Sequence, residues 1–449
     1  MRSYISEFES KEKPKDYYTK IIEELKRKNA ELNAFNIIND EINSGFPFSV
    51  KDNICVNGVE STASSKILKT YTPPFDATVV EKFKHNGFSF LGKTNMDEFG
   101  FGSFGINCEK PAKNPINSDY VAGGSSSGAA IATALLKYHI AVAESTGGSI
   151  SAPAAFCGVV GFTPTYGALS RYGLIDYANS LDKIGFMARS AADIRTVLKQ
   201  CTGRDGKDTT SSSQPLTDNP KAKLTVITEL MDKTDEKIKS AFLRFLDKIK
   251  SLDYKIEYVS LPEIEHSIPA YYIVSTAEAS TNLARYTGFK YGFKVEDFSK
   301  KYNDFFTEAR NQFGMEAKRR IVLGTFVRSA SVKDKYYVKA LKIRRLLINR
   351  IKRLLKDSLL ISPTMPIQTP KIDEVKKLSP TQSYAMDAFT IPPNFCGFPH
   401  ASFTYDYLAG MPIGAQIVTD QFNDYAALSF IDSWENIFDY KFKYNIGAL

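Results

Sequence analysis

Short apolar runs of four to seven residues recur along the 449-residue chain, and stretches with helical spacing separate them. Runs of this length between turn residues are typical of buried strands, and their alternation with helices predicts an α/β fold. The expected strands are 46–50, 88–92, 140–144, 159–162, 223–228, 358–363 and 412–418. Apolar residues spaced by three and four predict helices over 77–85, 191–200 and 234–250, and longer helical stretches over 263–285 and 308–355. The first three of these helices have Asp76, Ser190 and Thr234 as expected N-caps.

No run of about 18 apolar residues interrupts this pattern, so the sequence predicts no membrane-spanning helix. The first 18 residues, MRSYISEFESKEKPKDYY, contain acidic residues and no apolar segment, unlike a signal or transit peptide. Five cysteines without a CxxC pair favour neither a disulfide framework nor a zinc site, and they indicate a reducing compartment. We therefore expect a cytoplasmic protein, or one of an organelle matrix, whose net charge of +8 only hints at an anionic partner.

The polar stretch 203–219 has no periodicity and few apolar residues, and we interpret it as a surface linker. It follows a core of about 40–200 and precedes a helical region of about 263–355. After that region the chain returns to strand-like segments, over about 358–440.

Two segments dense in glycine and serine lie within this core: 123–130 (GGSSSGAA) and 145–155 (STGGSISAPAA). Each precedes or opens a run that can form a helix, so a row of backbone N–H groups would face outward with the positive end of a helix dipole behind it. Such a row can hold a negative charge. The sequence leaves three interpretations open: a phosphate cradle, an oxyanion hole, or a tightly packed turn.

A phosphate cradle is also suggested by residues 87–94, GFSFLGKT, which match the pattern GxxxxGK[ST] of P-loop enzymes. That loop requires a strand before its first glycine, whereas here FSFL within the motif is itself the expected strand. We therefore expect ATP, if it is used, to bind elsewhere.

An oxyanion hole would need a nucleophile with a base, and the four histidines are poorly placed to act as one. His85 and His139 lie at or after expected helix ends. His266 lies in a helical stretch and His400 follows a proline, so all four are interpreted as structural. Lys51 is the remaining candidate, because it ends an expected strand where apolar neighbours would desolvate its ammonium and lower its pKa.

These residues carry a family resemblance. Five segments follow one another in the order and spacing of the amidase signature family: FPFSVKDN, GKTNMDEFGFGSFG, GGSSSGAA, STGGSISAPAAFCGVVGF and PTYGALSRYGL. The resemblance extends over about 20–440. It implies one compact α/β/α domain over 1–449, in which helices cover a large mixed β-sheet.

The resemblance also implies a Ser–Ser–Lys catalytic set, in which Ser149 matches the nucleophile, Ser125 the bridging serine and Lys51 the base. An oxyanion hole would be formed by backbone amides of the nucleophile loop, at Thr146, Gly147, Gly148 and Ser149.

In that set a neutral Lys51 would take a proton from Ser125, which takes one from Ser149 as Ser149 attacks a carboxamide. The relay would then reverse to protonate the departing ammonia. Burial beside uncharged serines favours a neutral lysine, and position 145 offers no carboxylate to favour the ammonium. Asp52 follows directly, but on a strand its side chain should point to the opposite face. The resemblance further implies a cis peptide bond between Gly124 and Ser125.

Three charged residues that are usual in the family are absent from this chain. Its aspartate, arginine and lysine are replaced by Ser145, Ser151 and Thr163. We infer that they form one ion cluster in relatives and are replaced here as a set, because removing one member of a buried pair costs about 3–5 kcal/mol. We expect the replacements to affect stability or tuning near the site more than the reaction itself.

Three further stretches, 270–292, 314–326 and 385–399, resemble the glutamine-hydrolysing subunits of tRNA-dependent amidotransferases. By this resemblance Arg320 would bind the α-carboxylate of glutamine and Asp387 its α-ammonium, while Tyr271 would line the same site. A zwitterion needs one cation and one anion held apart, and the arginine fork suits a carboxylate. Taken singly, Arg320 and Asp387 could instead be ordinary helix residues.

The resemblance implies a glutaminase that passes ammonia to a kinase–transferase partner, the B subunit, which would bind ATP, Mg²⁺ and mischarged tRNA. A small C-like subunit would complete the complex, and this chain itself would hold no cofactor or metal. The acceptor would be Glu-tRNA(Gln), Asp-tRNA(Asn) or both. Two alternatives stay open: a free-standing amidase for another small amide, and a catalytically silent scaffold within such a complex.

Overall fold

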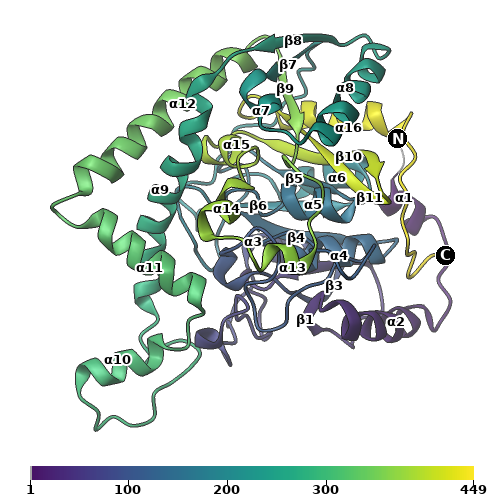
Figure 1. Ribbon diagram of the computed structural model, residues 1–449. Coiled ribbons are helices and arrows are strands. Elements are labelled where there is room, and N and C mark those ends of the chain that lie inside the picture. The colour runs from purple at the N-terminus through teal and green to yellow at the C-terminus, as the bar shows by residue number, and fades with distance from the viewer. Residues whose placement is uncertain (1–2) are drawn as a thin grey trace.

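One mixed sheet of eleven strands runs through the computed structural model, which describes residues 3–449 (Figure 1). The strands are β1 Phe35–Ile38, β2 Phe46–Lys51, β3 Phe88–Thr94, β4 Ile140–Ser145, β5 Val160–Thr163, β6 Lys183–Ala188, β7 Lys223–Ile227, β8 Lys255–Val259, β9 Leu359–Pro363, β10 His400–Leu408 and β11 Met411–Val418. Their order across the sheet is β1-β3-β2-β4-β6-β5-β10-β11-β9-β7-β8. The β2–β3, β2–β4, β7–β8 and β7–β9 pairs are parallel, and the other neighbours are antiparallel.

All seven strands expected from the sequence are present in this sheet. The sequence did not predict β1, β6, β8 and β10. β1 has only four residues, and β8 is largely exposed at the sheet edge, so neither carries a continuous buried apolar run. β10 carries polar residues that pairing with β5 and β11 buries, which is a tertiary effect that apolar pattern alone does not reveal.

The GFSFLGKT motif contains the whole of β3 and does not form a phosphate loop. Lys93 of this motif is fully buried, and its Nζ donates a hydrogen bond to Ser61 Oγ at 2.9 Å. The expectation that the motif is a strand is therefore confirmed, and its lysine is not available to a phosphate group.

Helices cover both faces of the sheet. One layer contains α3 (Thr78–His85), α6 (Ala191–Cys201), α8 (Glu236–Lys250) and α16 (Asp424–Glu435), and the other contains α4 (Ser127–Leu135) and α5 (Ser151–Cys157). In β6, the Phe186 ring packs on Phe83 of α3, whereas Gly185 faces Ile150 just before α5. Because successive strand residues point to opposite faces, α3 and α5 lie on opposite sides of the sheet. The expected α/β/α arrangement is confirmed.

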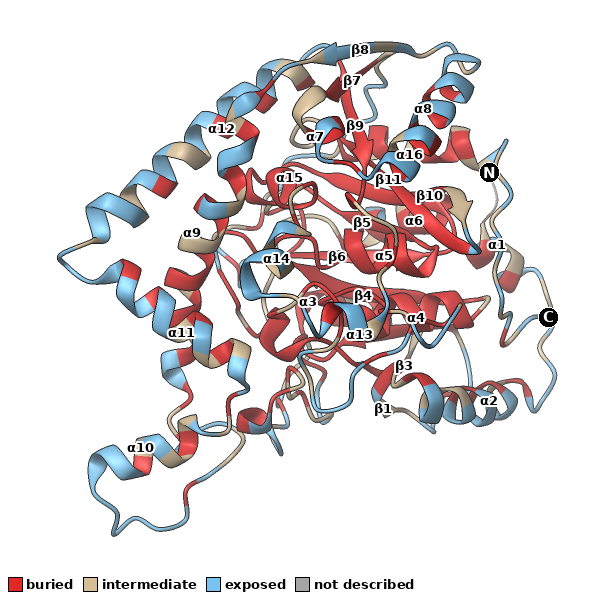
Figure 2. Cartoon of the chain, viewed as in Figure 1, coloured by how far each residue is buried: buried red, intermediate tan, exposed pale blue. Residues whose placement is uncertain are grey.

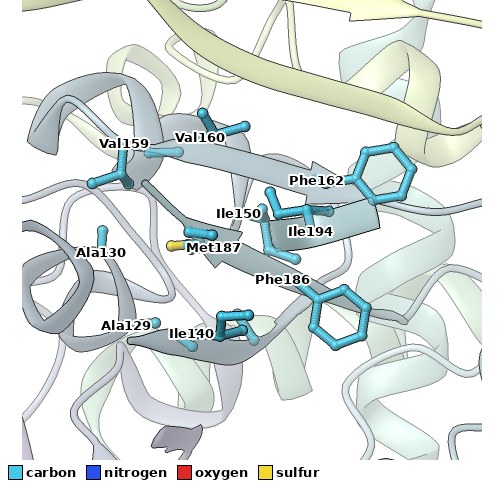
Figure 3. Packing of buried hydrophobic residues seen from close by; sticks show 14 of the residues in the cluster. Ala129, Ala130, Ile140, Ile150, Val159, Val160, Phe162, Phe186, Met187 and Ile194 are labelled. Carbon is cyan, nitrogen blue, oxygen red and sulfur yellow. The ribbon is translucent and has the colours of Figure 1, made fainter. Parts of the chain in front are cut away.

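The hydrophobic core fills the space between these layers. Figure 3 shows part of it, with side chains of β4, β5 and β6 beside Ala129 and Ala130 of α4. Alanine at both positions lets α4 approach the sheet closely. Each fully buried Val, Leu, Ile or Phe side chain contributes about 1.5–3 kcal/mol relative to exposure, so this packing fixes the strands that carry the candidate site.

The long helical stretches expected from the sequence are present but interrupted. Most of 263–285 is α9 (Ser267–Asn282), and 308–355 is divided among the end of α10 (Tyr302–Arg310), α11 (Met315–Arg328) and α12 (Lys339–Leu355). Gly314 is the N-cap of α11 and donates its N–H to Glu98 Oε2 at 2.9 Å. α9 packs against α11 and α12 at one side of the molecule (Figure 1), and the outer faces of α11 and α12 are exposed (Figure 2).

The N-cap expectations met different outcomes. Ser190 caps α6, since its hydroxyl accepts from the backbone N of Asp193. The expectations for Asp76 and Thr234 are wrong. Asp76 instead accepts from the backbone N of Asn57, and Thr234 donates its hydroxyl back to a carbonyl in the preceding turn. The caps of α3 and α8 are the next residues, Ala77 and Asp235.

Segment 203–219, interpreted as a surface linker, contains no helix or strand. It is nevertheless tied to the body of the protein, because Asp208 pairs with Arg171 and Asp205 accepts from Thr78 and Ser170. The remaining α-helices within residues 3–449 are α1 Tyr4–Glu9, α2 Tyr17–Leu32, α7 Thr228–Asp232, α13 Ile372–Val375, α14 Pro380–Ala385 and α15 Ile391–Phe395. None of the helices within residues 3–449 has the length and apolarity needed to span a bilayer.

Candidate active site

Two parallel strands bring Lys51 to the centre of the site. β2 and β4 are neighbours with Val50 opposite Val142, so their carboxyl ends meet at the same edge of the sheet. Lys51, the last residue of β2, is fully buried there. Its Nζ lies 2.7 Å from Ser125 Oγ, 3.0 Å from the carbonyl oxygen of Glu144 and 2.9 Å from Glu144 Oε2.

The two glycine–serine segments meet beside this lysine. The backbone N of Ser126 donates to the carbonyl of Ser149 at 3.2 Å, which joins the loop that carries Ser125 to the loop that carries Ser149. The Gly124–Ser125 peptide bond is cis, as the resemblance implied. Ser149 is 5% exposed and lies in the turn before α5. The structure thus brings together Lys51, Ser125 and the loop that carries Ser149.

Close approach to the nucleophile loop explains its glycines. A Cβ on Gly147 would lie 2.9 Å from the hydroxyl of Tyr271, and one on Gly148 would lie 2.2 Å from Thr390 Oγ1. Any other residue at these positions would push both side chains away. The oxyanion hole at Thr146, Gly147, Gly148 and Ser149 stays a prediction, and these four residues lie in the segment that leads into α5.

Ser125 lies beside Lys51 as expected, but a carboxylate that the sequence did not place there also contacts it. Glu144, the residue before Ser145, is fully buried and its carboxylate contacts Lys51 directly. Burial lowers the pKa of Lys51, while the charges of Glu144, Asp97 and Asp182 oppose that shift. Asp52 does point away, as expected, since its carboxylate accepts from the hydroxyl of Thr62.

The two residues assigned to the glutamine zwitterion lie close to a common tyrosine. Asp387 accepts from Ser103 Oγ at 2.7 Å and from the Tyr272 hydroxyl at 2.9 Å. Arg320 of α11 is 3% exposed, and its Nε donates to Glu316 Oε1 at 2.9 Å. Four aromatic rings lie within 5.1–5.5 Å of its guanidinium carbon: Phe101, Tyr177, Tyr272 and Tyr384.

Tyr271, which was expected to line the glutamine site, and its neighbour Tyr272 contact different parts of the site. Tyr271 lies over Gly147 of the nucleophile loop, whereas Tyr272 contacts Asp387 and the Arg320 guanidinium. Six residues at or beside the site were missed: Ser103, Glu144, Tyr177, Asp182, Tyr272 and Tyr384. Glu144 did carry a signal, because a glutamate at the end of the buried apolar run IAVAE requires a partner.

None of the hydrogen bonds that the four histidines make among residues 3–449 involves Lys51. His139 is buried between Ser49 and Thr133, where burial lowers its pKa to about 3. His400 is buried in β10, and burial holds its pKa well below the usual value. His85 ends α3 and His266 precedes α9. Within residues 3–449, no group of three or more His, Cys, Asp or Glu side chains could hold a metal ion.

The positions where the family's charged residues are replaced are all buried. Ser145 Oγ donates to the carbonyl of Gly147 at 3.3 Å. The hydroxyls of Ser151 and Thr163 have no hydrogen-bond partner among the described residues. Three charges at such buried positions would need one another as partners. The inferred ion cluster of relatives stays a prediction.

The chain is similar to known amidases over nearly its whole length. A family model described as Amidase matches residues 2–428. The A subunit of glutamyl-tRNA(Gln) amidotransferase from Sulfolobus acidocaldarius is 38% identical, over 97% of this chain and 96% of the relative. The protein of the same name from Nitratiruptor sp. is 39% identical, over 95% of this chain and 98% of the relative.

Solved structures agree with these sequence matches. The crystal structure of the corresponding A subunit from Thermotoga maritima has a TM-score of 0.79 at 32% identity, covering 92% of this chain and 89% of that chain. The structure of 6-aminohexanoate cyclic dimer hydrolase has a TM-score of 0.81 at 21% identity, covering 96% of each chain, and this likeness concerns the fold alone.

Proposed function

The chain belongs to the amidase family, and from that membership we propose that it is the glutamine-hydrolysing subunit of a tRNA-dependent amidotransferase. The observation that carries the proposal is the 2.7 Å contact between Lys51 Nζ and Ser125 Oγ, at the loop that holds Ser149. Relatives that match nearly the whole length of the chain have the name of this subunit, which supports glutamine as the amide donor.

The reaction proceeds by acyl transfer to Ser149. Lys51 in its neutral form takes the Ser125 proton while Ser125 takes the proton of Ser149, and the Ser149 oxygen attacks the carboxamide carbon. Amides of the nucleophile loop stabilise the oxyanion. The proton then returns from Lys51 through Ser125 to the leaving nitrogen as the C–N bond breaks, and ammonia departs. Water then hydrolyses the glutamyl ester on Ser149 by the same proton path.

Glutamine is positioned by its two charged groups. The guanidinium of Arg320 binds the α-carboxylate and the carboxylate of Asp387 binds the α-ammonium. Burial raises the pKa of Asp387, while hydrogen bonds from Ser103 and Tyr272 oppose the shift. These two hydroxyls favour the ionised form that an ammonium group requires.

The released ammonia serves a partner. A kinase–transferase B subunit binds ATP, Mg²⁺ and the charged tRNA, and a small C-like subunit completes the complex, so this chain needs no cofactor of its own. Names of the relatives favour Glu-tRNA(Gln) as the acceptor, with Asp-tRNA(Asn) as the other candidate. Contact with tRNA is made mainly by the partner, and the compartment is the cytoplasm or an organelle matrix.

Ammonia release from glutamine tests this function. The complex of the chain with its partner subunits, supplied with charged tRNA, is expected to release ammonia from glutamine faster than the chain alone. Mass spectrometry of a rapidly quenched single turnover is expected to detect a glutamyl adduct on Ser149. A rate independent of partner and tRNA would indicate a free-standing amidase, and an absent adduct together with no hydrolysis would indicate a silent scaffold.

A prediction concerns recognition of the zwitterion. Arg320→Ala and Asp387→Ala are each expected to lower kcat/KM for glutamine between roughly 10- and 150-fold, the value of a hydrogen bond to a charged group. Hydrolysis of a small amide without charges should fall much less, because it offers neither group to bind. Steady-state kinetics with both substrates give the comparison.

Arg320→Lys and Arg353→Ala serve as controls for that prediction. Lysine keeps the charge without the fork, so its loss should be intermediate. Arg353 is exposed on α12, and its truncation should leave both substrates unaffected. Equal losses on glutamine and the small amide in Arg320→Ala would show that Arg320 supports structure and not recognition.

A further inference from the structure

Both carboxylate oxygens of Glu144 are engaged next to the proposed base. Glu144 Oε2 lies 2.9 Å from Lys51 Nζ and 3.2 Å from Asn53 Nδ2. Glu144 Oε1 lies 2.7 Å from the hydroxyl of Thr146. The relay described above gives this buried carboxylate no part, although it contacts the base directly.

A second buried carboxylate lies on the other side of Thr146. The Thr146 hydroxyl is 2.8 Å from Asp182 Oδ1. Asp182 Oδ2 accepts from the backbone N of Tyr177 and of Ala178, both at 2.9 Å. These two amides fix the carboxyl group so that Oδ1 faces the hydroxyl.

The protons available to these contacts can be counted. A threonine hydroxyl has one hydrogen, yet it lies at hydrogen-bond distance from an oxygen of Glu144 and an oxygen of Asp182. Both contacts can be hydrogen bonds only if one of the two carboxyl groups carries a proton and donates it to the hydroxyl. Burial raises the pKa of Asp182 well above its usual value, and the Glu144 charge adds to that shift.

We propose that Glu144 and Asp182 share one proton through the hydroxyl of Thr146, and that Glu144 thereby orients Lys51 and stabilises the ammonium that forms on it. The proposal rests on the proposed hydrolytic function of Ser149. Glu144 is a positioning residue, since it acts on the reaction through Lys51 and does not touch the amide.

The contacts of Lys51 show how the orientation works. A neutral amine has two hydrogens and one lone pair. Two of the three partners, the carbonyl oxygen and Oε2 of Glu144, can only accept, so they take both hydrogens and the lone pair points to Ser125. When Lys51 gains the Ser125 proton, its new charge lies 2.9 Å from Glu144. A buried aspartate orients and stabilises histidine in the same way in serine proteases.

The direction of the pH effect follows from the charges that face Lys51. Glu144, Asp97 and Asp182 all raise the pKa of Lys51 against the larger effect of burial. Burial raises the pKa of Asp97 itself to about 6. Lys183 of β6 lies opposite Ser145 in the strand register, so its side chain is on the face of β4 away from Glu144. Its Nζ donates to the carbonyl of Phe398. Removing the Glu144 charge therefore lowers the pKa of Lys51, and the neutral base persists to lower pH.

The pH dependence of Ser149 labelling tests the proposal. A fluorophosphonate probe reacts with an activated serine whatever the natural amide is, so its rate reports on Lys51 directly. Glu144→Gln is expected to slow labelling by roughly 10²-fold or more. It should also move the acidic limb of the profile to lower pH by about 1–3 units. A side chain with only a structural role would lower the rate without moving the limb.

Two variants control for charge and for burial. Glu144→Asp keeps the charge on a shorter side chain, so its acidic limb should stay near that of the wild type. Asp193→Asn removes a different buried carboxylate, which binds Ser3 and Ser190 near the N-terminus, and it should leave the limb unmoved. An unshifted limb in Glu144→Gln, or an equal shift in Asp193→Asn, would overturn the proposal.

Infrared spectroscopy tests the shared proton without any reaction. At pH 8 a protonated-carboxyl band is expected in the wild type, and it should be absent from both Glu144→Gln and Asp182→Asn, because each leaves one ionised carboxylate. A band that persists in both variants would overturn the shared proton. Failure of the proposed function has a different result from failure of the shared proton. The wild type would then react with the probe at Ser149 or show the protonated-carboxyl band, but it would release no ammonia from glutamine.

Discussion

Ser149→Ala is expected to lower glutamine hydrolysis by about 10⁴-fold or more, while transfer of free ammonia by the assembled complex continues. The proposed nucleophile is the only group that this variant removes, since alanine fills the same turn before α5. Free ammonia bypasses the step that this chain performs and reaches the partner's transferase site unaided. Ammonia release and amide formation on tRNA, measured on one preparation, give both activities.

Ser127→Ala is the matched control for that experiment. Ser127 belongs to the other glycine–serine segment and is fully buried, but its hydroxyl has no hydrogen-bond partner among residues 3–449. Its removal should therefore leave glutamine hydrolysis near the wild-type rate. If Ser149→Ala lost both activities in a correctly assembled complex, the defect would not be confined to glutamine hydrolysis, and the assignment of Ser149 as the nucleophile would be rejected.

The sequence predicted those parts of the fold that depend on short-range pattern. The strands β2, β3 and β4 each carry a buried apolar run, and all three were expected. β10 was missed because its polar residues become buried only through pairing with β5 and β11. The Asp76 cap failed for a related reason, since its carboxylate accepts from the backbone N of Asn57 and not from the next helix.

The site was predicted as far as motifs within single segments of the chain could specify its residues. Lys51, Ser125 and Ser149 came from separate segments of a family pattern, and the structure assembles the first two in direct contact. The charge environment of Lys51 was not predictable in this way. Glu144 reaches Lys51 because β2 and β4 are parallel neighbours, and Asp182 reaches Thr146 from the segment before β6.

This charge environment also changes how the role of Lys51 can be tested. Lys51→Arg would keep a positive charge that cannot be lost, but the side chain is fully buried and its Nζ already contacts Ser125 and Glu144. A larger guanidinium there would overpack the site at a cost of typically 1–3 kcal/mol, so its inactivity would be ambiguous. Methionine has similar length and volume and no proton to exchange, so it is the sharper substitution.

Lys51→Met is expected to lower glutamine hydrolysis by about 10⁴-fold and to destabilise the protein by about 1–3 kcal/mol, because it removes the amine that donates to the buried Glu144 carboxylate. The double variant Lys51→Met/Glu144→Gln removes that charge and should regain most of the lost stability. It should regain no activity, because Ser125 still has no base. Denaturant unfolding and ammonia release measured on the wild type, both single variants and the double variant separate the two effects. Recovery of hydrolysis together with stability in the double variant would show that Lys51 supports the fold of the site and is not its base.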